Sequence, residues 1–500
     1  MRCAIHDVAA TDLEQRCRAA LETGARLQLA YAWFPGGAAR TGTQAAELRY
    51  VVHRGAGRPP EIWRCRPEGR AVPSLAAVAP LLSWYEREIT DLCGLSFSDQ
   101  PLPEPLVLLA GATATRPPLE PGPATPLQYV PTPSTLPEVA GPARRDVQLL
   151  PFGPIRADVL ESAQFTFFYI GEGILHYQPQ LFFKHRGMEK RFEGLDPALG
   201  TVLAERVSGV GSAAHALSFC QALEAAAGTD VPRRAAWLRV LIAELERVYN
   251  HLHFLGHLCH TTTLKVGEAE GKYLEELAKQ LNARATGSRL LRGLICPGGL
   301  RREPDIGAIA GPLTKLHEEF CRYAQMLESS TTHLDRLITT GVLGRQLAFD
   351  QGATGPIERA SGVDRDTRRD QPYGAYAEMP LRVAVSGSCD AHARQQVRIA
   401  ELENSIGIIR FVLEALPQGP IRTECRPPPG GEGLGWAESP RGSVYYAVHV
   451  DDAGKLARVK IKSPSFSNWR VFPYTVHESN MMDYAINEAS FGLTIAGCDR

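Results

Sequence analysis

The sequence lacks the features that mark several common classes of protein. None of its 11 cysteines stands in a C-x-x-C pair, which argues against zinc-ribbon and iron–sulfur ligand sets in this chain. No run approaches the roughly 18 consecutive apolar residues of a membrane-spanning helix, so we expect no such helix. A net charge of −1 gives no electrostatic basis for binding nucleic acid or anionic lipid. The odd number of cysteines, without a signal sequence, predicts a reducing compartment.

The length and composition are typical of a globular protein with more than one domain. The chain has 500 residues, of which 44% are hydrophobic and 22% charged. We expect an α+β fold, in which residues 1–100 form a small α+β domain. Residues 101–148 are rich in Pro, Ala, Thr and Gly, which predicts an extended, partly solvated linker. Residues 149–500 are expected to form a mostly helical bundle domain flanked by small β elements.

Several segments have periods clear enough to predict single elements. Apolar spacing predicts an amphipathic helix over 81–93 that ends at Gly94 and presents its charged residues to solvent. A long helix is expected over 234–253. Gly171-Glu172-Gly173, between two apolar runs, predicts the turn of a β-hairpin. The C-terminal part is expected to return to strands, with a turn at 463–466.

Two segments are densely charged. His185-Arg186-Gly187-Met188-Glu189-Lys190 places an imidazole, a guanidinium, a carboxylate and an ammonium around one glycine. Such a group could relay protons or stabilise a reduced neighbouring centre, but it could equally be a charged turn before a helix. Residues 355–370 alternate in the sign of their charges, which favours a solvated loop or an ion-pair network that faces another subunit.

Four histidines follow one another in a helical pattern. His253, His257 and His260 fall on one helical face, which suits a zinc or nickel ion geometrically, and His251 precedes them. However, no carboxylate accompanies them locally, and Gly256 is expected to interrupt the helix. Packed or partner-facing histidines are therefore the favoured interpretation.

Two further segments follow metal-binding patterns whose sulfur ligands are missing. Residues 206–215 fit R-x-C-G-x-C-x-x-x-H, and residues 494–500 fit C-x-x-C-x-D-R, apart from the cysteines. The positions at which these patterns have cysteine are occupied by Ser208, Gly211, Thr494 and Gly497. A thiolate-rich site selects soft transition metals, and Ser, Gly and Thr cannot replace four such ligands. We therefore expect no metal to be bound at these positions.

With these motifs, the sequence resembles one lineage over nearly its whole length. The first hundred residues resemble the 30-kDa subunit of respiratory complex I. The remainder resembles the 49-kDa subunit of complex I and the large subunit of energy-converting nickel–iron hydrogenases of the formate hydrogenlyase and hydrogenase-4 type. The matching landmarks, in order, are Gly153-Pro154, 185–190, 205–207, 243–251, 298–302, 355–362, 440–442 and Asp499-Arg500.

The resemblance implies which cofactors the chain has lost. In the hydrogenases the four cysteines hold nickel and iron, so the resemblance implies no nickel–iron centre here. In quinone-reducing complex I, a histidine of the first hairpin and a tyrosine of the first long helix bind the quinone headgroup. Ungapped matching puts Leu160 at the histidine position and Phe219 at the tyrosine position. Leucine makes no side-chain hydrogen bond and phenylalanine lacks the hydroxyl group, so this headgroup clamp is missing.

The resemblance also implies a function and its partners. It implies a soluble-arm subunit of a membrane-docked oxidoreductase, peripheral on the cytoplasmic side of the cell membrane, that takes electrons from an iron–sulfur cluster of a small partner subunit. Antiporter-like membrane subunits are the other expected partners, and quinone is a candidate acceptor. A catalytically silent coupling subunit of an ion-translocating complex is the alternative. The candidate shell of charged residues consists of His185, Arg186, Glu189, His215, Asp499 and Arg500.

Overall fold

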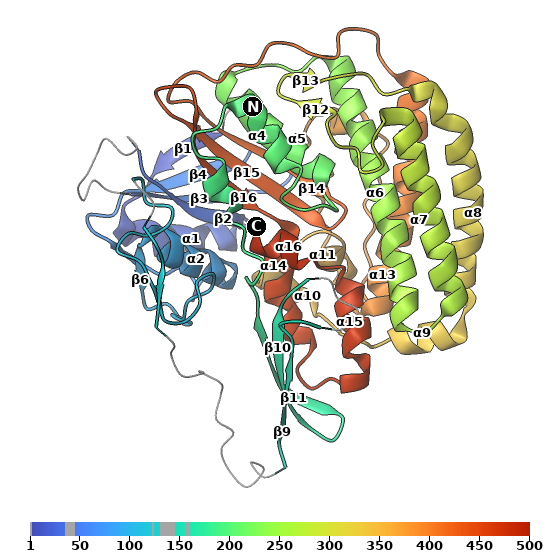
Figure 1. Cartoon of the computed structure of the whole chain (residues 1–500), viewed down its shortest axis with the longest axis horizontal. Helices are drawn as coiled ribbons and strands as arrows, with labels where there is room; N and C mark the ends of the chain where they lie inside the picture. Colours follow the sequence, from blue (N-terminus) through green and yellow to red (C-terminus); the bar gives the residue numbers. More distant parts are fainter. Residues whose placement is uncertain (1–2, 36–45, 123–124, 131–145, 157–160) are drawn as a thin grey trace.

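A computed structural model describes residues 3–35, 46–122, 125–130, 146–156 and 161–500 (Figure 1). The fold is mixed α+β, as predicted. A β-rich N-terminal region is followed by a largely helical middle and a small C-terminal sheet. Within the described ranges, no helix combines the length and the apolar character needed to cross a membrane.

The N-terminal region is a four-stranded sheet with two helices. Its elements are β1 (Ala4–Asp7), α1 (Leu13–Glu22), β2 (Arg26–Trp33), β3 (Glu47–His53), β4 (Glu61–Cys65) and α2 (Ser83–Cys93). The strand order is β1-β4-β3-β2, in which β1 runs parallel to β4 and the other pairs are antiparallel. Helix α2 ends at Gly94, whose φ of 72° is left-handed, as predicted. The prediction of a solvated charged face is wrong, since Glu86 and Glu88 are buried. The buried Glu86 carboxylate is satisfied by hydrogen bonds from the Ser74 hydroxyl and the Leu75 amide.

The described part of the proline-rich stretch is partly solvated, as predicted, with residues 101–105 and 126–130 exposed, but residues 106–108 and Leu119 pack against α2. It begins after β5 (Ala71–Pro73) and β6 (Ser96–Ser98), which pair in parallel, and contains the short antiparallel pair β7 (Ala112–Thr113) and β8 (Gln128–Tyr129). The Asp91 carboxylate of α2 accepts from the backbone amides of Leu106, Val107 and Leu108 at 2.7–3.2 Å. Leu119 is 6% exposed. One carboxylate from α2 thus fixes a segment that has no period of its own.

A three-stranded antiparallel sheet follows and projects from the body of the molecule (Figure 1). It consists of β9 (Gln148–Phe152), β10 (Gln164–Ile170) and β11 (Gly173–Gln180), in the order β11-β10-β9. The predicted hairpin is confirmed, since β10 and β11 are joined at Gly171-Glu172.

The middle of the chain is helical, with α6, α7, α8 and α13 side by side (Figure 1). The elements are α3 (Met188–Arg191), α4 (Pro197–Ala204), α5 (Ser212–Ala227), α6 (Arg233–Thr261), α7 (Lys265–Thr286), β12 (Ile295–Cys296), β13 (Gly299–Leu300), α8 (Ala310–Ser329), α9 (Thr331–Leu337), α10 (Arg345–Asp350), α11 (Pro356–Ala360), α12 (Thr367–Asp370) and α13 (Ala391–Ala415). The predicted break at Gly256 is wrong, because α6 runs through it without interruption. Gly256 instead lets α7 approach: a Cβ on Gly271 would lie 2.5 Å from the Gly256 Cα.

The C-terminal part forms an antiparallel sheet and three helices. They are β14 (Glu432–Ser439), β15 (Gly442–Val450), β16 (Leu456–Lys462), α14 (Pro464–Val471), α15 (Tyr484–Phe491) and α16 (Ile495–Asp499), with strand order β14-β15-β16. The turn predicted at 463–466 is the start of α14, in which Ser463 caps the helix by accepting from the Phe466 amide. Helix α5 packs directly against β14. A Cβ on Gly433 or Gly435 of this strand would lie 2.0–2.1 Å from a carbonyl oxygen of α5.

The N-terminal sheet lies beside this C-terminal sheet, which places α2 against the end of the chain (Figure 1). Lys462 of β16 donates to Gln28 of β2 at 3.0 Å. The hydroxyl of Tyr31 in β2 lies 3.2 Å from the His449 ring nitrogen in β15. These contacts join residues that are more than four hundred positions apart in the sequence.

Most of the charged stretch 355–370 is buried in an ion-pair network, although Asp364 and Arg369 are exposed, so the prediction of a solvated loop is wrong for most of this segment. Arg359 contacts Glu401 of α13 at 2.7 Å and Glu438 of β14 at 3.1 Å. Arg368 contacts Glu244 of α6 at 3.2 Å. Carboxylates from distant elements therefore compensate the buried guanidinium groups within this chain.

Candidate functional site

Five of the six candidate shell residues come together where the β11–α3 loop meets α16. The backbone amide of Lys184 donates to the Asp499 carboxylate at 2.8 Å. The His185 Nδ1 lies 2.7 Å from the Asp499 carbonyl oxygen, and the Arg186 amide donates to the Arg500 carbonyl at 2.9 Å. The loop thus holds the last turn of the chain through its backbone. The segment 185–190 is both a charged turn and the start of the short helix α3.

Glu189 and Arg500 belong to a buried ion cluster that also takes in α2 and β16. This cluster, here called the Glu189 cluster, consists of Glu88, Glu189, Arg458, Lys460 and Arg500. Arg500 bridges Glu88 at 2.9 Å and Glu189 at 3.1 Å, and Lys460 bridges the same two carboxylates at 2.6 and 3.2 Å. Arg458 reaches Glu189 at 2.7 Å. Three cations face two carboxylates, which leaves one excess positive charge within the cluster.

The charges of the cluster decide the protonation of Glu189. Burial opposes ionisation of this carboxyl, but Lys460, Arg458 and Arg500 outweigh burial and hold its pKa well below the ordinary value. The Glu189 carboxylate therefore stays ionised at neutral pH. The cluster is a fixed positive centre rather than a proton carrier.

Three members of the cluster were missed by sequence reasoning. Glu88 lies in a helix whose charged face was predicted to be solvated. Arg458 and Lys460 alternate along β16 with Val459, so all three fit an ordinary amphipathic strand. The available signal was the run of cations on one face of this strand. The sequence does not show that this face is buried as well as the apolar one, and only the fold does.

Arg186 is exposed and acts as a clip between two segments. Its guanidinium donates to the carbonyl oxygens of Arg206 at 3.1 Å, Val207 at 2.7 Å and Ala496 at 2.8 Å. These carbonyls belong to the loop before α5 and to α16. The clip therefore draws together the two segments that carry the cysteine-lacking motifs.

The four motif positions lie close together, and three of them line a cavity of about 10 Å³. Its lining includes Ser208, Gly211 and Gly497. The Thr494 hydroxyl caps α16 through the Gly497 amide and lies 3.1 Å from the Ser465 hydroxyl. Such a volume holds about one water molecule. Two hydroxyl groups and two glycines do not fit a nickel–iron centre, because thiolate ligands are absent and the space is too small.

His215 lies deeper than the rest of the shell, on α5. Its Nδ1 is 2.9 Å from the Tyr446 hydroxyl group, and burial lowers its pKa to about 3. His215 is therefore neutral at physiological pH. It lines the cavity of the motif positions but does not contact the Glu189 cluster.

The two positions matched to the quinone clamp have different outcomes. Phe219 is fully buried, with its ring 5.3 Å from that of Phe192 and 5.8 Å from that of Tyr446. This ring is part of the core and is closed to a ligand. Leu160 lies outside the described residues.

Asp499 is the shell residue best suited to exchange a proton. It is fully buried, and burial raises its pKa to about 7, against the effect of hydrogen bonds from the Lys184 and Phe182 amides. Its second oxygen, Oδ1, has no hydrogen-bond partner among the described residues. A carboxyl group in this state can take up or release a proton near neutral pH.

A cavity of about 60 Å³ opens beside the Glu189 cluster, with room for a few water molecules. It lies between α2, the packed proline-rich stretch and the β11–α3 loop. Both carboxylates of the cluster line it, together with His185 and Lys190. The shell therefore adjoins a small cavity on the side of the N-terminal region.

The histidines of α6 are not gathered around one point. His251 is buried and pairs with Glu401 at 2.9 Å. His253 and His260 are about half exposed, and each pairs with one carboxylate of α7, Glu275 or Glu268, at 3.0 Å. Partner-facing histidines fit this arrangement better than a common metal ion.

Comparison with known proteins relates both parts of the chain to respiratory subunits. Residues 51–121 match the family described as respiratory-chain NADH dehydrogenase, 30 Kd subunit, and residues 274–429 and 423–500 match the 49 Kd subunit family. Residues 186–289 match the nickel-dependent hydrogenase family.

Individual relatives cover most of the chain. Formate hydrogenlyase subunit 5 of Escherichia coli is 31% identical over 82% of this chain and 74% of its own length, and hydrogenase-4 component G of the same organism is 29% identical over 83% and 73%. A subunit of the NADH-quinone oxidoreductase of Clostridium beijerinckii is 29% identical over 70% of this chain and 96% of its own. A chain of the membrane-bound sulfane sulfur reductase, an archaeal respiratory membrane complex, superposes with a TM-score of 0.67 at 26% identity, covering 72% of this chain and all of that chain.

Proposed function

Because the chain belongs to the family of fused 30-kDa/49-kDa complex I subunits, related to formate hydrogenlyase subunit 5 and hydrogenase-4 component G, we propose that it is an electron-transfer subunit of a membrane-bound respiratory complex. Electrons arrive from an iron–sulfur cluster of a small partner subunit and leave to quinone or another acceptor. No nickel–iron centre takes part. The complex reaches the membrane through antiporter-like subunits, on its cytoplasmic side.

One observation carries this proposal. The charged shell is assembled and fixed by short contacts, yet the cavity that it adjoins has no thiolate ligand and a volume of about 10 Å³. The carboxylates of the buried ion cluster are paired with cations of this chain, so the shell is assembled without a metal ion. The shell therefore supports a role that does not depend on the metal.

The residues of the shell divide this work. Arg186 presents a guanidinium at the surface, held by three carbonyls, and the positive Glu189 cluster lies behind it. Fixed positive charge stabilises the reduced form of an adjacent redox centre. Asp499 has a pKa of about 7 and can supply a proton when an acceptor such as quinone takes up electrons and protons together. Because Phe219 is buried in the core, it cannot contact a quinone headgroup. The acceptor is therefore bound by residues other than those at the histidine and tyrosine positions of the family's clamp.

Electron transfer through the intact complex tests the proposal. The clusters of the purified complex are reduced, a short-chain quinone analogue is added, and cluster re-oxidation is followed by electron paramagnetic resonance. We expect re-oxidation that slows about ten-fold or more in Asp499→Asn and Arg186→Gln. Arg18→Gln, at an exposed i,i+4 pair of α1, is the matched control and should change nothing. No re-oxidation by any acceptor in the intact complex would refute the proposal.

A coupling subunit without redox activity is the second candidate, favoured by the closed surroundings of Phe219 and the small cavity. Measuring ion transport and cluster re-oxidation separately in the same variants distinguishes the two. Loss of transport with unchanged re-oxidation would favour the coupling role over the electron-transfer role.

A further inference from the structure

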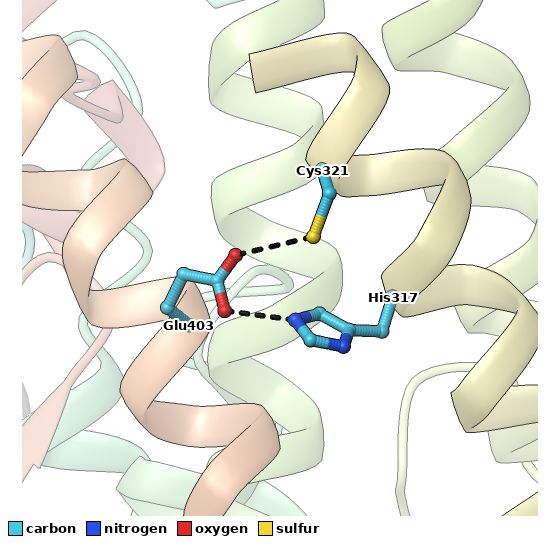
Figure 2. Close-up of side chains that lie close together, drawn as sticks. All are labelled: His317, Cys321 and Glu403. Carbon is cyan, nitrogen blue, oxygen red and sulfur yellow. Dashed lines mark hydrogen bonds and ion pairs between the residues drawn. The ribbon is translucent and has the colours of Figure 1, made fainter. Parts of the chain in front are cut away.

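Three side chains of metal-ligand type converge between α8 and α13, on the helical side of the molecule (Figure 2). The His317 Nε2 lies 2.8 Å from one carboxylate oxygen of Glu403, and the Cys321 Sγ lies 3.6 Å from the other. One ligand atom from each residue lies within 4.8 Å of both others. None of these residues belongs to the shell described above.

The helices hold this group in place. His317 and Cys321 are four residues apart on α8 and so lie on the same face, one turn from each other. Glu403 comes from α13, which packs beside α8. Cys321 and Glu403 are exposed, and Cys321 is the one cysteine among the described residues that is exposed rather than buried or half-buried. An ion from solvent can therefore reach all three ligand atoms without opening the core.

The ligand types select the ion. Mg²⁺ and Ca²⁺ require oxygen ligands, whereas an imidazole, a thiolate and a carboxylate together suit Zn²⁺, with water at the fourth position. We propose that His317, Cys321 and Glu403 bind one Zn²⁺ ion that links α8 to α13. Hydrogen bonds to Glu403 account for each contact separately, whereas a bound ion also accounts for the convergence of three different ligand types on one point.

A fourth residue competes with the ion. Arg410 donates to the His317 Nδ1 at 3.1 Å, so the imidazole carries its proton on Nε2, towards Glu403. Binding of Zn²⁺ at Nε2 moves this proton to Nδ1, where Arg410 can no longer donate. The Arg410 side chain must therefore turn away when the ion binds.

The protons balance as follows. The imidazole is neutral before and after binding and changes its tautomer. The Cys321 thiol loses one proton to solvent as the sulfur–metal bond forms. Each ion bound thus releases one proton, and the apparent affinity rises with pH.

Titration of the purified full-length chain with Co²⁺, a spectroscopic substitute for Zn²⁺, tests the proposal. We expect one equivalent to give a thiolate-to-cobalt charge-transfer absorption that Zn²⁺ removes by competition. Cys321→Ser should abolish the absorption, and Glu403→Gln should weaken binding at least ten-fold. Arg410→Gln should tighten binding, which a merely structural role of these residues does not predict.

Two control variants locate the ion. Cys389→Ser alters another cysteine that is partly accessible, and His257→Gln alters the exposed histidine row of α6. Both should leave the absorption unchanged. Absence of the absorption in the wild-type chain, its survival in Cys321→Ser, or its loss in His257→Gln would overturn the proposal.

Discussion

Arg500 and Glu88 lie 2.9 Å apart, although 412 positions separate them in the sequence. Through this pair the last residue of the chain enters the same ion cluster as the helix that closes the N-terminal region. Both side chains are buried. The regions that match the two subunit families are thus joined here by a buried set of ion pairs, in addition to the peptide chain.

Removing Glu88 should destabilise the protein strongly. In Glu88→Ala, Lys460 and Arg500 each lose a carboxylate while they remain buried, and breaking a buried pair in this way costs about 3–5 kcal/mol. Urea denaturation followed by circular dichroism measures the change in the free energy of unfolding. Glu14→Ala, which breaks the exposed pair with Arg18, should have little effect. Equal effects of the two substitutions would show that the cluster does not hold the regions together.

Asp499 should make the stability depend on pH between about pH 4 and pH 7. Its pKa is raised from 3.8 to about 7, mainly by burial, so in this window the unfolded chain releases a proton that the folded chain retains. The free energy of unfolding therefore falls as the pH rises through the window, and the loss is complete above about pH 7. Asn cannot ionise, and its oxygen can still accept from the Lys184 amide.

We therefore expect Asp499→Asn to reduce this fall by roughly 2–4 kcal/mol. Denaturation curves of both proteins at the two ends of the window give the measurement. Curves that shift in parallel for wild type and variant would contradict the assignment of a buried, protonated Asp499.

The crossing of α6 and α7 should not tolerate a methyl group. A Cβ on Gly271 would lie 2.5 Å from the backbone of Gly256, so Gly271→Ala forces the helices apart and should cost about 1–3 kcal/mol. Gly407 lies exposed on α13 with no atom within 4 Å of an added Cβ. Gly407→Ala should instead stabilise the chain by about 0.5–1 kcal/mol. Thermal unfolding of both variants provides the comparison, and the same sign of change in both would be inconsistent with the packing.

Local patterns were sufficient for some elements and insufficient for others. The end of α2 at Gly94 and the hairpin at Gly171-Glu172 were predictable, because left-handed and tight turns favour glycine at the positions that make them. Ser463-Pro464 also carried a helix-start signal, a cap followed by proline at the first turn, which the expectation of a simple turn overlooked.

The remaining features depend on neighbours that are distant in the sequence. Gly256 is a helix-breaking residue when taken alone and a packing residue once Gly271 lies against it. Gly433 weakens the strand pattern of β14 in the sequence, but the fold requires a glycine there because α5 packs directly against it. Glu88 belongs to the Glu189 cluster through Lys460 and Arg500, which lie 372 and 412 residues further along the chain. No period of the local sequence could show these contacts.

We propose that this chain transfers electrons without a nickel–iron centre. Exposing the purified, oxidised complex to hydrogen gas while recording its iron–sulfur clusters tests it most directly. We predict that hydrogen leaves the clusters oxidised, whereas chemically reduced clusters pass electrons to a quinone analogue, because the four motif positions offer no thiolate ligand. Reduction of the clusters by hydrogen, with nickel retained in stoichiometric amount, would contradict the account.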